Sequence, residues 1–203
     1  ADFTIFENEN GLTVSAADVV KEYDGNSYGV TATARIKNAE IENPNITIKY
    51  WNEKTNAYDL DESPEYRNVA DTPAAVKFEA SLYGYKSVQG EATVTITRRP
   101  VTIKAKESSK VYGNPDPAFD LATLENSVGD ELKDLDLTVI RSDAGDDTIK
   151  VHENVLSIQN SKEALEKEYT NYTFTIIPAD FTIFENENGL TVSAADVVKE
   201  YDG

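Results

Sequence analysis

The first 25 residues of the chain return, letter for letter, as its last 25. The segment ADFTIFENENGLTVSAADVVKEYDG occupies residues 1–25 and again residues 179–203, a shift of 179 − 1 = 178 residues. Folding does not require that every exposed Glu, Asn and Lys of a segment be kept, so this identity reflects duplication rather than physical necessity. A repeat of this length predicts a modular array whose units are each large enough to fold alone.

The 178-residue unit divides again into two related halves. Residues 12–26 align with residues 101–115 at a shift of 89, and residues 84–96 align with residues 171–183. The first pair of segments shares Thr13, Ala16, Lys21 and Tyr23 with Thr102, Ala105, Lys110 and Tyr112. The sequence therefore predicts two domains, at 12–100 and 101–189. Residues 1–11 are then expected to be the last strand of a preceding repeat, and residues 190–203 the first strand of the following one.

Most segments of the chain alternate apolar and polar residues with a period of two. Clear examples are 45–51, 74–80, 91–97, 101–106 and 135–141. Strands of this kind, separated by turn residues, predict an all-β fold of two tandem Ig-like β-sandwich domains. One short helix is expected after Ser161, whose hydroxyl can cap residues 162–169. A β-grasp-like second domain is the alternative.

Composition excludes several classes of function. The formal net charge is −18, which repels nucleic acid and anionic membrane surfaces. The chain has no cysteine, so disulfide scaffolds and thiol catalysis are excluded. No apolar run is long enough to cross a bilayer, so no membrane insertion is expected.

The two expected domain joints differ in composition. Residues 98–100 read Arg-Arg-Pro, and proline restricts both its own backbone and that of the residue before it. This joint should limit bending. Residues 186–189 end in glycine, so the joint between repeats is expected to bend more.

Several motifs, in order along the chain, resemble known repeat families. The first domain has KEYDG at 21–25, ESPEYRNV at 62–69, GYK at 84–86 and GEATVTI at 90–96. The second has KVYGNPDP at 110–117, Gly129-Asp130, Arg141 before an acidic turn, NYT at 171–173 and ADFTI at 179–183. These resemble the YDG and MBG modules, respectively, of large bacterial, Firmicutes-like cell-surface adhesin proteins. The resemblance implies β-sandwich repeats, extracellular display, cell-wall attachment through other parts of the parent chain, and no catalytic residues to transfer.

Catalytic and metal chemistry finds little support in the sequence. His152 is the only histidine, and no nucleophile is signalled beside it, so it is predicted to be a structural residue of a strand or turn. No enzyme activity, organic cofactor or zinc site is therefore expected. Acidic clusters at 59–62, 134–136 and 143–147 leave a structural calcium site open, with 143–147 as first candidate. Asp134 and Asp136 are also interpretable as the solvent face of a strand.

Aromatic residues and lysines leave three further alternatives. Tyr23, Tyr85, Tyr112 and Tyr172 recur at matching positions, which favours a framework role over sugar stacking, although Tyr83 and Tyr85 flank Gly84 and could form a platform. Trp51 is a candidate core tryptophan of the first domain. A covalent Lys–Asn or Lys–Asp crosslink remains open by analogy with other bacterial stalk domains.

Together these features favour a structural stalk of repeated sandwich domains that lifts a distal binding region from a bacterial cell. The alternative is a repeat that itself binds a glycan or host protein through many weak sites. A domain accompanying a hydrolase elsewhere in the parent chain is a third hypothesis. The expected partners are neighbouring repeats, and the apolar residues of 190–203 should be covered by end-to-end packing or strand exchange between copies.

Overall fold

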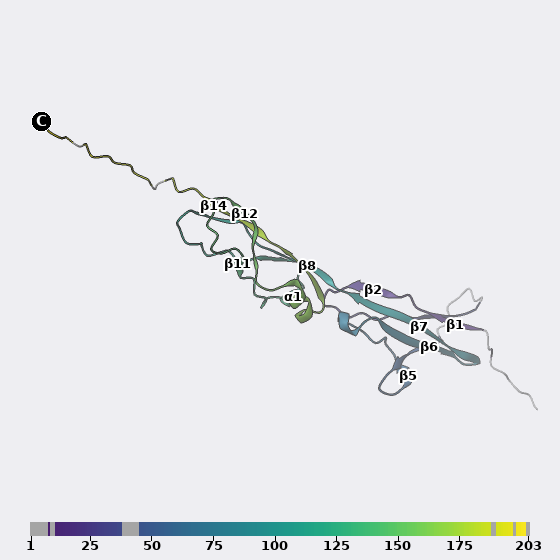
Figure 1. Ribbon diagram of the computed structural model, residues 1–203. Helices are drawn as coiled ribbons and strands as arrows, with labels where there is room; N and C mark the ends of the chain where they lie inside the picture. Colours follow the sequence, from purple (N-terminus) through teal and green to yellow (C-terminus); the bar gives the residue numbers. More distant parts are fainter. Residues whose placement is uncertain (1–7, 9–10, 38–44, 188–189, 197, 202–203) are drawn as a thin grey trace, which may run out of the picture. The chain divides into compact units, whose positions relative to one another are not determined.

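A computed structural model describes residues 8, 11–37, 45–187, 190–196 and 198–201. The regular secondary structure of these residues is mostly β-strand, with one α-helix among them (Figure 1). The fold is therefore all-β in class, as the period-two patterns predict. The chain forms two compact units. Unit 1 comprises residues 1–102, 125–135 and 161–175, and unit 2 comprises residues 103–124, 136–160 and 176–203.

Unit 1 contains a five-stranded sheet. Its strand order is β2 (Val19–Glu22), β7 (Tyr85–Thr97), β6 (Ala74–Leu82), β4 (Thr47–Asn52) and β5 (Ala57–Leu60). The long strands β6 and β7 run side by side as an antiparallel hairpin (Figure 1). Gly84 closes the hairpin turn with a φ of 82°, a backbone conformation that glycine adopts without strain. At the edge of the sheet, β2 pairs with β7 in parallel.

A second, smaller layer packs on this sheet. Strands β1 (Leu12–Ser15) and β3 (Thr33–Ile36) pair with each other in antiparallel fashion. β1 lies close to β6 and β7 without being hydrogen-bonded to either, so the two-stranded sheet covers one face of the larger one. The buried residues between the layers include Leu12, Val76, Phe78 and Val94. Their alternation along each strand is the period-two signal of the sequence.

Three further strands form a separate sheet, and the described residues also contain one short α-helix and one 3-10 turn. Strands β10 (Thr123–Glu125), β8 (Arg99–Lys104) and β13 (Tyr172–Ile177) form a sheet in that order. Only Arg98 separates β7 from β8, so Pro100 lies inside a strand rather than in a linker. Helix α1 (Lys162–Glu168) begins after Ser161, whose Oγ accepts the Ala164 N–H at 3.2 Å as predicted. A single 3-10 turn, η1 (Val69–Asp71), precedes β6.

Unit 2 contains a four-stranded sheet. Its strand order is β11 (Val139–Arg141), β12 (Val151–Ile158), β14 (Ala179–Phe184) and β9 (Ser108–Val111). β14 pairs antiparallel with β12 and parallel with β9. The inward residues Leu156, Phe181 and Ile183 are fully buried.

The two units share a strand arrangement. In unit 1 the order β2-β7-β6-β4 begins with a parallel pair, and in unit 2 the order β9-β14-β12-β11 begins with a parallel pair. Glu22 stands opposite Thr97 in the first pair, and Val111 stands opposite Phe184 in the second. The next residue then donates its N–H to the same strand. Tyr23 N bonds Thr97 O at 2.9 Å, and Tyr112 N bonds Phe184 O at 2.8 Å. This agreement supports a common ancestry of the two halves of the 178-residue repeat.

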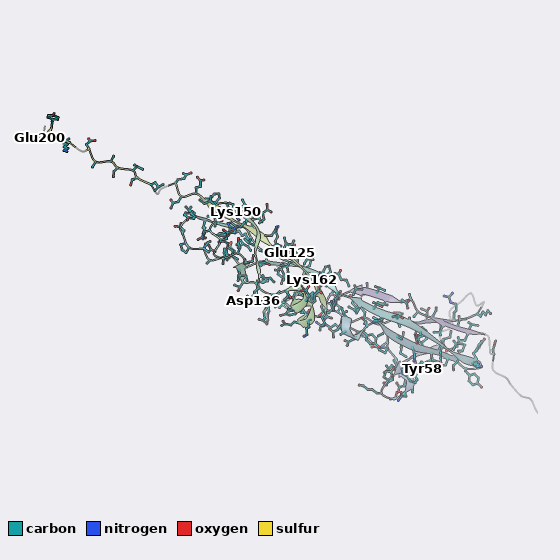
Figure 2. All side chains as sticks on the ribbon, in the orientation of Figure 1. Tyr58, Glu125, Asp136, Lys150, Lys162 and Glu200 are labelled. Carbon is teal, nitrogen blue, oxygen red and sulfur yellow. The ribbon has the colours of Figure 1, made fainter. Side chains whose placement is uncertain are left out.

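Other details differ from the sequence-based expectations. Asp134 and Asp136 do not alternate along a strand, because β11 begins only at Val139. Asp136 instead accepts the Thr138 N–H at 2.9 Å in a local side-chain turn, a conformation that competes with strand formation. Trp51 is only half-buried and packs edge-on against Tyr58, a residue labelled on β5 in Figure 2, so it is not part of the buried core.

The duplicated ends fall partly outside the described residues. Residues 1–7, the expected last strand of a preceding repeat, are among those not described. The described part of 190–203 contains no regular secondary structure, and Leu190, Val192, Val198 and Tyr201 are almost fully exposed along an extended segment (Figure 2, near Glu200). The boundaries at 12–100 and 101–189 and the covering of the tail by a neighbour stay predictions.

Candidate functional site

Unit 1 contains a group of hydrogen-bonded polar side chains around Glu131, which we call the Glu131 cluster; its two tyrosines are buried, whereas Glu131 and Arg67 are partly exposed to solvent. It consists of Tyr23, Arg67, Glu131 and Tyr172. The Tyr172 hydroxyl donates to Glu131 Oε2 at 2.6 Å, and the Tyr23 hydroxyl donates to Oε1 at 2.7 Å. The Arg67 guanidinium donates to Oε1 at 2.9 Å. The two tyrosine rings meet edge to face with centroids 5.4 Å apart.

The electrostatics of this cluster follow from its burial. Burial alone would raise the pKa of Glu131, but hydrogen bonds from Tyr172, Tyr23 and Arg67 outweigh it and hold that pKa below its usual value. Burial, reinforced by the hydrogen bond to Glu131, raises the pKa of Tyr172. The carboxylate is therefore ionised and the tyrosines are neutral donors at neutral pH. None of the four side chains is therefore poised to exchange a proton near pH 7.

An open cavity of about 320 Å³ lies beside the Glu131 cluster. Its remaining wall includes Asn68, Asn171 and Tyr169. Asn171 Nδ2 donates to Asn68 Oδ1 at 3.1 Å, and Asn171 Oδ1 accepts the Val69 N–H at 2.9 Å. The volume lies at the small end of the range for small-molecule sites, and the wall combines aromatic and hydrogen-bonding groups.

Unit 2 contains a second polar group, which we call the Arg141 cluster. It consists of Lys110, Asp116, Arg141, Asp143, Asp146, Asp147 and His152. Arg141 is buried, and its guanidinium lies over the Phe181 ring, 4.5 Å from the centroid. Its Nε donates to Asp143 Oδ1 at 2.7 Å, and its Nη1 lies 3.2 Å from both oxygens of Asp116. Strand β11 positions this side chain, because Val139 and Arg141 both point inward from it.

Lys110 and His152 complete the Arg141 cluster. Lys110 Nζ lies 2.7 Å from Asp116 Oδ1 and 2.5 Å from Asp147 Oδ1. Lys110 donates hydrogen bonds to both carboxylates, and these bonds raise the pKa of its amine, which is therefore an ammonium ion. The buried His152 has Nδ1 2.5 Å from Asp143 Oδ2 and Nε2 2.9 Å from Thr148 O. His152 therefore lies in a strand, as predicted, and is held by structural partners.

Three members of the Arg141 cluster have the geometry of a possible cation site. Ligand atoms of Asp143, Asp146 and His152 lie within 4.8 Å of one another. All of them already have protein partners, because Asp143 bonds Arg141 and His152, and the Asp146 carboxylate bonds Thr148 and Lys150. Both ring nitrogens of His152 are also engaged. Calcium requires six to eight oxygen ligands. Arg141 and Lys150 already place positive charge beside the two carboxylates of this trio.

The carboxylates of this cluster are held in their ionised forms. Burial would raise the pKa of Asp143, but hydrogen bonds from Arg141 and His152 keep it below its usual value. Burial would also raise the pKa of Asp116, but hydrogen bonds from Lys110 and Arg141 lower it by more, so that pKa too lies below its usual value. The hydroxyl and the backbone N–H of Thr148 lower the pKa of Asp146. The cluster is therefore a network of ion pairs fixed by hydrogen bonds.

The predicted framework tyrosines do not all share one environment. Tyr23 and Tyr172 are buried as predicted, whereas Tyr85 is half-buried. Tyr112 is 49% exposed, so the framework prediction is wrong for that ring in this chain. Tyr83 is fully exposed.

The sequence did not signal Glu131, and it showed Arg67 only as part of the motif at 62–69, without its contact to Glu131. Glu131 lies 108 residues from Tyr23 and 41 from Tyr172, so no local spacing signals their meeting. The one available signal was the recurrence of Tyr23 and Tyr172, whose hydroxyls need a partner when buried. Arg141 was noticed before its acidic turn, but its burial could not be read from the sequence.

Across the described ranges, no helix is both long enough and apolar enough to span a bilayer. Comparison with protein-family models, curated proteins and solved structures gives no match for this chain.

Proposed function

We propose that the chain is a segment of a structural stalk built from 178-residue repeats. The observation that carries the proposal is the identity of residues 1–25 with residues 179–203, exposed side chains included. The shared strand order of the two units supports it, because the 178-residue repeat then contains an older duplication of one β-module. Within each polar cluster, the side chains form hydrogen bonds and ion pairs with other members of the same cluster. Such internally bonded groups suit a scaffold.

The finer details of the proposal come from the sequence motifs. On this proposal the repeats are tandem Ig-like sandwiches, with a β-grasp-like second domain as the alternative. They resemble the YDG and MBG modules of bacterial cell-surface adhesins, and they act outside the cell to extend a distal binding region. The net charge of −18 would keep neighbouring stalks apart through mutual repulsion. The proposal assigns the repeat no enzymatic activity.

Chains of one, two and three repeats test this proposal. Strands of 8–10 residues at about 3.3 Å per residue, with loops, give domains of about 30–40 Å, so a repeat of two domains placed lengthwise would add about 60–80 Å. Small-angle X-ray scattering should show a maximum dimension that grows by the same increment with each repeat. A maximum dimension that barely grows, with compact particles, would contradict a stalk.

The cavity beside the Glu131 cluster favours a second candidate function, the binding of a glycan or a host protein. Tyr169 and the exposed part of Arg67 offer an aromatic edge and hydrogen-bond donors to a polar ligand. Weak binding of this kind would gain strength from repetition along an array.

A glycan array probed with the single chain tests this second candidate. Binding that is lost in the Tyr169→Ala variant and kept in the Tyr83→Ala variant would support it, because Tyr83 is exposed and does not line the cavity. Absence of binding by a multi-repeat chain would rule out glycan binding and leave the stalk proposal standing.

A further inference from the structure

Tyr23 and Tyr112 occupy equivalent positions but differ in exposure. Each follows the last residue of the parallel edge strand, and each donates its N–H to the neighbouring strand, at 2.9 Å and 2.8 Å respectively. Tyr23 is 2% exposed, whereas Tyr112 is 49% exposed. The strand pairing up to each tyrosine is therefore the same, and the exposure of the two rings differs.

The cover over Tyr23 comes from residues that lie more than 100 positions later in the sequence. Tyr172 packs edge-on against its ring at 5.4 Å, and Glu131 accepts its hydroxyl. Both residues belong to the part of the sequence after the end of β7. Tyr23 is thus covered, within unit 1, by residues from the second half of the repeat sequence.

A backbone hydrogen bond accompanies this cover. Arg99, two residues after the end of β7 at Thr97, donates its N–H to Asn171 O at 3.0 Å, immediately before Tyr172. The equivalent of Asn171-Tyr172 in the first half of the sequence is Gly84-Tyr85, at a shift of 87. Gly84 O accepts the Asn8 N–H, also at 3.0 Å.

Asn8 is the same residue of the duplicated segment as Asn186. Asn186 lies two residues after the end of β14 at Phe184, as Arg99 lies two residues after Thr97. The bond Asn8 N to Gly84 O therefore shows, inside unit 1, the contact that Asn186 would make with the unit 1 of a following repeat. The bond from Arg99 N–H to Asn171 O is the equivalent contact between the first and second halves of one repeat, and it too lies within unit 1.

From this correspondence we propose that Tyr112 and residues 184–186 form a docking surface for the unit 1 of the following repeat. Tyr85 of that repeat packs against Tyr112 as Tyr172 packs against Tyr23, and its Gly84 O accepts the Asn186 N–H. The partner is a second copy of this chain's own unit, so the inference rests on the proposed array. It also replaces the flexible joint expected from Gly189 with a fixed one.

A chain of two consecutive repeats, compared with the present chain, tests this inference. In the present chain Tyr112→Ser should leave the melting temperature unchanged, because the ring is already half-exposed. In the two-repeat chain, Tyr112→Ser in the first repeat should lower the melting temperature of the following unit 1. Tyr85→Ser in the second repeat should add no further loss once Tyr112 is gone, since contacting residues couple. Leu121→Ser is the matched control, because Leu121 is exposed in unit 2 and has no part in the joint.

Tyrosine nitration read by mass spectrometry gives an independent measurement. One of the two copies of Tyr112 should be protected in the two-repeat chain, and none in the present chain. Full reactivity of both copies, together with additive effects of the two substitutions, would overturn the docking surface. If scattering still showed constant growth per repeat, the stalk would survive that result with flexible joints.

Discussion

Leu12 and Leu190 are the same residue of the same duplicated segment, yet Leu12 is 5% exposed and Leu190 is 97% exposed. Leu12 begins β1, stands opposite Ile36 and belongs to the core of unit 1. Leu190 lies in a segment without regular secondary structure. Because the letters around the two residues are identical, the difference comes entirely from their surroundings in the fold.

This pair allows a prediction with an internal control. Leu12→Ala should lower the free energy of unfolding by about 2–4 kcal/mol, since it removes a buried side chain and leaves a cavity. Leu190→Ala should leave it unchanged. Urea denaturation of both variants checks the prediction. Equal losses would show that residues 190–203 already belong to the fold of this chain, and so would a large loss on deleting those residues.

The Glu131 cluster predicts the effect of removing one hydroxyl. Tyr172→Phe keeps the ring but leaves Glu131 without its 2.6 Å donor. A hydrogen bond to a charged group contributes about 1.5–3 kcal/mol, so a loss of that size is expected in the free energy of unfolding. Tyr83→Phe is the control, because Tyr83 is fully exposed. The same small change in both variants would mean that the cluster contributes nothing to stability.

The lowered pKa of Glu131 predicts how its contribution depends on pH. A carboxyl group with a pKa lower in the folded than in the unfolded state stabilises the fold above its unfolded pKa, near 4.3 for Glu. That stability is lost as the pH falls through the folded pKa. The difference in unfolding free energy between the natural chain and Glu131→Gln should therefore be constant from pH 7 to about 5 and shrink in more acidic solution.

Denaturation midpoints at a series of pH values measure this difference. Asp116 and Asp143 have lowered pKa values too, so both proteins should weaken in acid. Only the difference between them reports on Glu131. A difference that grows as the pH falls would contradict the assigned hydrogen bonds.

Arg141 should be the most sensitive charged residue of unit 2. Arg141→Met keeps a long apolar chain over Phe181 but leaves Asp116 and Asp143 without their shared cation. Breaking a fully buried pair costs about 3–5 kcal/mol; because Asp116 and Asp143 are 27% and 28% exposed, the loss here should lie at or below the lower end of that range. Lys106→Met removes an exposed cation from its pair with Asp120 and should have no measurable effect. A thermal melt of unit 2 that is unmoved by Arg141→Met would contradict a stabilising role for the Arg141 cluster.

The strands of this fold could be predicted because their burial repeats with a period of two. Val76 and Phe78 in β6, and Val94 and Ile96 in β7, are buried where the alternation places them. The same signal was misleading at 135–138, where Asp136 accepts the Thr138 N–H and holds a turn. A hydrophobicity pattern carries no information about a side-chain hydrogen bond between residues two positions apart.

The Glu131 cluster could not be predicted because its members meet only through the tertiary fold. Tyr23, Arg67 and Tyr172 converge on Glu131 from distant parts of the sequence, and each would be an ordinary surface residue in another fold. The framework prediction for Tyr112 was wrong for a related reason. Its strand pairing matches that of Tyr23, but Tyr23 is covered by Tyr172 and Glu131 while the Tyr112 ring is half-exposed.

The central claim is that residues 190–203 are the opening strands of a following repeat. Hydrogen exchange followed by NMR tests it most directly, with a two-repeat chain in which only residues 179–203 of the joining segment carry ¹⁵N. In the present chain the amides of the described part of 190–203 should exchange at the rates of an unfolded peptide. In the two-repeat chain they should become protected to the level of Leu12–Ser15 and Val19–Glu22, which pair with β3 and β7. Amides that stay unprotected when a complete second repeat is present would contradict the array.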